Sequence, residues 1–236
     1  MKRWTMPLVA VLGAVIGAGA IWSLDRVVAP GAVDRARIET VVHDYVLANP
    51  EIIPLALQEL QARASGRLVA ANRDAIVTPF GNAWGGNPRG DVTVVEYFDY
   101  NCGYCRASLP MIADLVARDG GVRIVYRDLP ILAETSRVAA RVSLAAAQQG
   151  RFAAFHDALY AAGPVTPATI EAAAARAHVA PPADAKTIDV EIERNLQTAA
   201  KLGMNGTPSW VIGDRVLSGA LPVEDLQRAI AAARAR

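Results

Sequence analysis

The sequence has few of the residues that staple a fold or ligate a metal. Its 236 residues include two cysteines and three histidines. An exported domain held together by disulfides would carry more cysteine pairs, and a zinc site needs about four ligands, so both classes are disfavoured. Basic and acidic side chains nearly cancel, at 24 against 23 and a formal net charge of +1. Since no basic stripe interleaved with aromatics is present, nothing predicts a nucleic-acid partner.

What the chain does have is one Cys-x-x-Cys motif, formed by Cys102 and Cys105. It follows residues 92–98, whose β-branched and aromatic side chains predict a short strand buried on both faces. Residues 102–116 then predict a helix. Two thiols at i and i+3 lie close enough for a small-loop disulfide, and at the helix start free N–H groups and the dipole favour a thiolate. The pair therefore predicts reversible redox chemistry.

Two other interpretations of the pair are weaker. A structural disulfide normally ties distant segments together, and closing so short a loop constrains the unfolded chain little. A zinc site would need two further ligands from His43, His156 and His178, which have no paired ligand spacing. His156 falls among predicted helices, where we interpret it as a core or surface histidine rather than a catalytic one. We therefore expect no metal and no organic cofactor.

Glu96 is the anomaly within the predicted strand 92–98. Burial disfavours a charged carboxylate, so a buried Glu96 should have a raised pKa. If the strand lay at a sheet edge instead, Glu96 would simply face solvent. Asp99, just beyond the strand, is interpreted as a turn or capping residue.

A family resemblance rests on three features: the run VVEYFDYNCGYC, a helix carrying Pro110, and the much later Gly206-Thr207-Pro208. Together they resemble the DsbA-like branch of the thioredoxin superfamily, and within it the bacterial BdbD-like, Com1-like and ScsC-like proteins. The likeness covers roughly Asp74 to the C-terminus, and Asn49-Pro50-Glu51 also matches that group. The combination is specific, whereas Cys-x-x-Cys alone would not be.

The resemblance implies roles for individual residues. Cys102 would attack or be attacked, Cys105 would resolve the mixed disulfide, and Glu96 would move the proton of Cys105. The resemblance also implies a cis-proline at Pro208 that faces the cysteines, although composition alone would favour trans. The backbone of Thr207 would then pair with an extended substrate as an added strand.

The same resemblance implies a fold of the α/β class, a thioredoxin fold with an inserted α-helical domain at about residues 131–203. The dipeptide Gly103-Tyr104 between the cysteines is expected to tune the redox potential, and DsbA carries Pro-His there. Losing that histidine removes a favourable partner of the thiolate, so we expect a disulfide less oxidising than DsbA's. From the residue pattern, 75–78 is expected to be extended and 210–217 to form a β-hairpin.

Residues 1–24 are predicted to be a targeting segment. Two basic residues precede an apolar stretch from Met6 to Trp22, which is long for a signal-peptide core and short for a spanning helix. Cleavage after Ala20 is one outcome. An uncleaved inner-membrane anchor is the other and is slightly favoured, because Ile21 and Trp22 continue the apolar run. Either outcome places the thiols in the oxidising periplasm.

The expected domain organisation has two further regions, a tether with a helical extension at residues 25–73 and a DsbA-like thioredoxin domain at 74–236. In the extension, Asn49-Pro50 is predicted to end one amphipathic helix and cap the next. These helices either pack on their own domain or form an oligomerisation arm, as in ScsC-like relatives. No sustained heptad runs through them.

These features predict a thiol–disulfide oxidoreductase of the bacterial cell envelope, which exchanges disulfides with exported cysteine-containing proteins through a mixed disulfide. If a membrane redox partner keeps it oxidised, it is an oxidase, the favoured hypothesis. If it is kept reduced and forms a homo-oligomer through its N-terminal helices, it is a disulfide isomerase. A chaperone or binding module with incidental cysteines is the weakest hypothesis.

Overall fold

The structure, a computed structural model, describes residues 33–235. The chain divides between Gln58 and Glu59 into two compact units. The domain boundary after residue 73 stays a prediction, as does the targeting segment, which lies outside the described residues. Three helices come first: α2 (Val33–Ala48), α3 (Ile52–Ala71) and α4 (Arg73–Val77).

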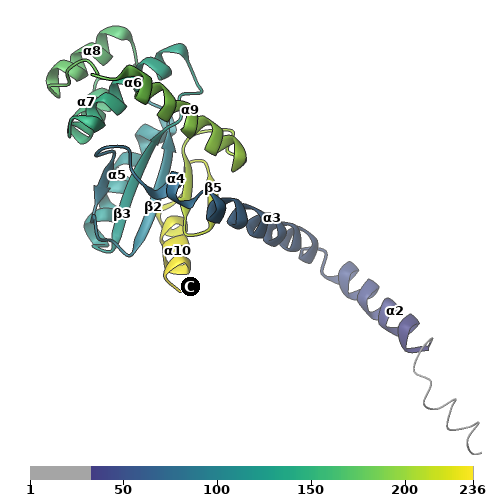
Figure 1. Cartoon of the computed structure of the whole chain (residues 1–236). Coiled ribbons are helices and arrows are strands. Elements are labelled where there is room, and N and C mark those ends of the chain that lie inside the picture. The colour runs from purple at the N-terminus through teal and green to yellow at the C-terminus, as the bar shows by residue number, and fades with distance from the viewer. Residues whose placement is uncertain (1–32, 236) are drawn as a thin grey trace, which may run out of the picture. The chain divides into compact units, whose positions relative to one another are not determined.

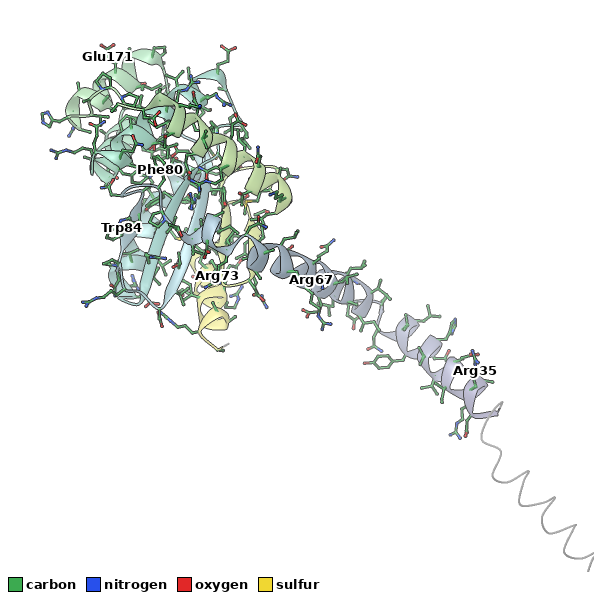
Figure 2. The ribbon with its side chains drawn as sticks, viewed as in Figure 1. Arg35, Arg67, Arg73, Phe80, Trp84 and Glu171 are labelled. Atoms are coloured by element: carbon green, nitrogen blue, oxygen red, sulfur yellow. The ribbon has the colours of Figure 1, made fainter. Side chains whose placement is uncertain are left out.

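Helix α2 leaves its apolar side chains exposed, among them Ile38, Val41, Val42, Tyr45 and Leu47. Figure 2 shows side chains standing out along this helix, where Arg35 is labelled. Asn49 does not cap the next helix as expected. Its amide instead donates to the Tyr45 carbonyl at 2.9 Å, and α3 begins at Ile52. Asn49 therefore terminates α2 rather than starting α3.

A five-stranded sheet forms the centre of the second unit, in the order β1-β3-β2-β4-β5. Its strands are β1 (Trp84–Gly86), β2 (Val92–Phe98), β3 (Val122–Asp128), β4 (Ser209–Ile212) and β5 (Arg215–Ser218). Strands β2 and β3 pair in parallel, and the other neighbours are antiparallel. Parallel strands need a crossover, which α5 (Gly103–Arg118) supplies. The predicted strand, crossover helix, strand unit and the final hairpin are confirmed.

Side chains of the central strands alternate between two helical layers, as strand geometry requires. Val94 and Trp210 pack with α5 and α10 (Val223–Arg234) on one face. Val95 and Tyr97 pack on the other face with Ile76 of α4 and the end of α9 (Ala185–Lys201). The site therefore rests on a strand that is buried from both sides.

Four helices are inserted between β3 and β4: α6 (Glu134–Gln148), α7 (Phe152–Ala161), α8 (Pro167–Arg176) and α9. Thr166 caps α8 by accepting the Thr169 N–H at 3.1 Å, with Pro167 as the first helical residue. Figure 1 shows the helices α6 to α8 grouped beyond one end of the sheet. That end is where β2 finishes and the Cys-x-x-Cys motif begins. The expected α/β fold with a helical insertion is confirmed.

The extended segment expected at residues 75–78 is wrong, because residues 73–77 form α4. A distant side chain explains the difference. The guanidinium of Arg127 on β3 donates to the carbonyls of Ile76 and Thr78. These bonds satisfy carbonyls that the end of a short helix leaves free.

Candidate functional site

Cys102 lies between β2 and α5, at the position that caps the helix, with an extended backbone. Its sulfur accepts the Cys105 N–H at 3.3 Å and donates to the Thr207 carbonyl at 3.1 Å. Both cysteines are free thiols. A sulfur at this position faces the free N–H groups and the positive end of the helix dipole, which favour a thiolate. Cys102 is thus placed as the reactive thiol of the pair.

Cys105 lies in the first turn of α5 and is 1% exposed. Burial raises its pKa, and the neighbouring charge of Glu96 raises it further. A hydrogen bond from the Asp99 backbone acts in the opposite direction. Cys105 is therefore held as a neutral thiol, which must lose its proton before it can attack a disulfide.

Glu96 lies in the central strand and is 1% exposed. In register it is flanked by Tyr126 on β3 and Trp210 on β4. Burial and then the charge of Cys102 raise its pKa from 4.5 to about 8. The edge-strand interpretation is therefore wrong, and Glu96 is a protonated acid near neutral pH, coupled to both sulfurs.

The Thr207–Pro208 peptide bond is cis. The Thr207 carbonyl accepts the Cys102 thiol, and the Pro208 carbonyl accepts the Gly219 N–H at 2.8 Å. Within the described residues, the buried hydroxyl of Thr207 has no hydrogen-bond partner. This loop comes from a distant part of the sequence and lies directly against the reactive sulfur.

Gly103 and Tyr104, the residues between the cysteines, both face outward. Gly103 has open space around it, and Tyr104 is 68% exposed. Neither side chain has a polar contact with a cysteine among the printed bonds of the described chain. Any influence of this dipeptide on the redox potential therefore acts through the backbone and solvent.

The residues just before Cys102 are tied to the insertion far more extensively than the sequence indicated. The Asp99 carboxylate accepts the N–H groups of Ile131 and Leu132 at 2.9 and 3.0 Å. The Tyr100 hydroxyl donates to Ser143 at 3.1 Å and lies 3.2 Å from His156 Nδ1. No local pattern could reveal these contacts, because the partners are 32 to 56 residues away.

His156 belongs to the core, as expected. Its ring contacts several aromatic rings: Phe98, Tyr100, Tyr126, Phe152 and Tyr160. Burial lowers its pKa from 6.5 to about 3, so the ring is neutral at physiological pH. Among the described residues, no cluster of three or more His, Cys, Asp or Glu could hold a metal ion.

Two protein families match the chain. The family described as Thioredoxin matches residues 80–232. The family described as Copper resistance protein ScsC N-terminal domain matches residues 34–65. The first match covers the sheet, the cysteine pair and the cis-proline. The second covers α2 and most of α3.

Three solved structures are similar. A linker-deletion mutant of Proteus mirabilis ScsC is 26% identical, has a TM-score of 0.70, and covers 88% of this chain and 98% of its own. A thioredoxin-like oxidoreductase from Silicibacter pomeroyi is 40% identical, with TM-score 0.64, covering 70% and 99%. A periplasmic thioredoxin-like protein from Salmonella enterica serovar Typhimurium is 29% identical, with TM-score 0.64, covering 70% and 96%.

The curated relatives that match are much longer proteins. Na⁺/H⁺ antiporter NhaA 1 of Salinispora arenicola is 32% identical over 154 residues, which are 60% of this chain and 23% of the antiporter. The chain spans 37% of a second antiporter, from Salinispora tropica, at 28% identity. Within residues 33–235, no helix is long and apolar enough to cross a membrane. The likeness to the antiporters therefore concerns only a part of them.

Proposed function

Because the chain belongs to the thioredoxin family, as a DsbA-like and ScsC-like member, we propose that it is a thiol–disulfide oxidoreductase acting on exported proteins. One observation carries the proposal. The Cys102 sulfur lies at the N-terminus of α5, between the Cys105 N–H and the Thr207 carbonyl. That position combines a stabilised thiolate, a second thiol in reach and a backbone edge for a peptide.

In the oxidising direction, a substrate thiolate attacks Cys102 of the Cys102–Cys105 disulfide. The bond between the two cysteines breaks, and a mixed disulfide between the substrate and Cys102 forms. A second substrate thiolate then attacks the substrate sulfur of this mixed disulfide. The substrate disulfide forms, Cys102 leaves as a thiolate, and two electrons have passed from the substrate to the pair.

Glu96 supplies the proton that Cys105 takes up when it leaves as a thiolate. With a pKa of about 8, Glu96 is protonated near neutral pH and can donate. In the reverse direction it accepts the proton of Cys105, whose burial disfavours the charged thiolate. The acid thus allows a buried thiol to alternate between its charged and neutral forms.

The substrate is held as an extended peptide beside Thr207 and Pro208. Proline has no N–H to crowd the sulfur, and the backbone before it offers hydrogen bonds to a passing strand. We place the protein in the periplasm, exported by residues 1–24, since one similar structure is of a periplasmic protein. A membrane redox partner would reoxidise the pair after each turnover.

A second candidate function, disulfide isomerisation, is favoured by the N-terminal helices. Their match to the ScsC N-terminal domain coincides with exposed apolar side chains on α2 and α3. A row of exposed apolar residues indicates a surface that another chain covers. A homo-oligomer formed through these helices would bring several cysteine pairs to one misfolded substrate.

The test is a pair of assays on the full chain, each with Cys102→Ser as control. One follows oxidation of a reduced model protein by the oxidised chain, and the other follows reactivation of a protein with scrambled disulfides by the reduced chain. Fast oxidation with little reactivation supports the oxidase, and strong reactivation supports the isomerase. Equal activity of Cys102→Ser in both assays would contradict the proposed function and favour a chaperone.

A further inference from the structure

Asp99 holds the redox motif from both sides of its peptide. Its backbone carbonyl accepts the Cys102 N–H at 2.9 Å. Its backbone also hydrogen-bonds to the Cys105 sulfur, where it lowers the pKa of that thiol against the larger opposing effects of burial and Glu96. One residue therefore touches both cysteines through its main chain.

The side chain of Asp99 fixes where that main chain lies. It is 2% exposed and accepts three backbone N–H groups. One comes from Asn101 at 2.8 Å, which closes a local turn. The other two come from Ile131 and Leu132, in the loop between β3 and α6. The carboxylate thus fastens the turn before the nucleophile to a second loop.

The neighbouring contacts reinforce the same attachment. The Tyr160 hydroxyl of α7 donates to the Asp99 carbonyl at 3.3 Å. The Asn101 amide donates to Thr135 and Ser136 at the start of α6, at 3.0 and 2.9 Å. Only the Asp99 side chain, however, is bonded directly to the residue whose backbone meets both cysteines.

Building on the proposed function, we propose that Asp99 is a positioning residue for the closing step of exchange, in which Cys105 attacks the mixed disulfide. In that step the Cys105 thiolate forms a bond to Cys102, and the bond between Cys102 and the substrate sulfur breaks. The substrate leaves as a thiolate and takes up a proton. Asp99 acts through its backbone contact with Cys105, which its carboxylate keeps in place.

The experiment follows the two steps separately in the full reduced chain. Glutathione disulfide is added, samples are quenched with acid, and mass spectrometry counts the reduced, mixed-disulfide and closed forms. Opening of glutathione disulfide depends on Cys102, and closing depends on Cys105. In Asp99→Asn, one carboxylate oxygen becomes an N–H₂ group that cannot accept the backbone donors.

We expect Asp99→Asn to form the glutathione adduct within about twofold of the wild-type rate and to close it roughly tenfold more slowly, the size expected for one lost hydrogen bond to a charged group. Asp99→Ser keeps an acceptor for the local turn but is too short for the second loop, so it should behave alike. It also supplies the test if the amide variant fails to fold. Asp119→Asn is the matched control, because Asp119 also accepts the N–H two residues on, from Gly121.

Closure at the wild-type rate in either folded Asp99 variant would overturn the inference. Equal slowing of both steps would also overturn it, since that result indicates general loosening of the fold. If the wild-type chain forms no adduct at all, the proposed function fails instead. The two failures are therefore distinguishable in one experiment.

Discussion

The helix α2 and the end of the sheet that carries the cysteines use apolar residues in opposite ways. On α2 the apolar residues remain open, with Val41 61% and Val42 55% exposed. At the redox end, apolar and polar side chains alike are buried, and Glu96 and Asp99 are 1% and 2% exposed. The difference teaches that one region is complete within a single chain, whereas the other exposes a surface suited to a partner. Chemistry and assembly should therefore be separable by mutation.

The largest expected effect is on the chemistry itself. Cys102→Ser removes the attacking sulfur, so exchange with glutathione disulfide should fall by at least about a thousandfold. The far-ultraviolet circular dichroism spectrum should stay unchanged, because the hydroxyl can still accept the Cys105 N–H. Substantial residual exchange in this variant would contradict the assignment of the reactive thiol.

Next in size is the buried ion pair that supports the redox-bearing unit. Arg127 and Glu191 lie within 2.5 Å of each other and are 2% and 1% exposed. Arg127→Met leaves Glu191 without its buried partner, so we expect a loss of about 3–5 kcal/mol in the free energy of unfolding, measured with urea. Arg137→Met is the matched control, because Arg137 also pairs with a glutamate of α9, but in solvent. Equal losses in the two variants would contradict the account.

The third effect is the pH dependence of stability conferred by Glu96. Its folded pKa of about 8 lies above the usual 4.5, so its stabilising contribution is complete below about 4.5 and is lost as pH rises through 8. Glu96→Gln has no such loss. Relative to wild type, the reduced variant should therefore gain a few kcal/mol between pH 5 and pH 9. A constant difference across that range would show that Glu96 is not held protonated.

The smallest effect on the fold should come from α2. Val41→Glu with Val42→Glu places charges on the exposed apolar face, which should lower the solution mass to that of one chain. Exchange with glutathione disulfide should stay at the wild-type rate, and reactivation of scrambled protein should fall. Val190→Glu on α9 is the control, since Val190 is similarly exposed at 57% but lies outside α2 and α3. A wild-type chain that is already monomeric would contradict the assembly role.

The local features of the fold were predictable from the sequence, and the long-range ones were not. The β-branched run at residues 92–98 and the Thr166-Pro167 helix start depend on neighbouring residues, and both predictions are confirmed. Residues 75–78 were predicted to be extended because nothing nearby indicates that Arg127 satisfies the carbonyls of α4. Contacts across 51 residues have no signature in a local pattern.

The candidate site divides along the same line. The cysteine pair and the acidic anomaly at Glu96 stand out in the sequence, because a spacing and a misplaced charge are local signals. The part of Asp99 that the sequence indicated is its local turn with Asn101. Its attachment to Ile131 and Leu132 depends on how the loop after β3 packs, so only the structure could place it.

The most direct test of the central claim is to trap the mixed disulfide. Cys105→Ser removes the resolving thiol while leaving Cys102 in place, so the full chain carrying it should accumulate a covalent adduct with a disulfide-bonded peptide. Mass spectrometry after proteolysis should place the adduct on Cys102. The account predicts a stable adduct in Cys105→Ser and none in Cys102→Ser. Absence of an adduct in the first variant, or an equal amount in both, would contradict thiol–disulfide exchange at this site.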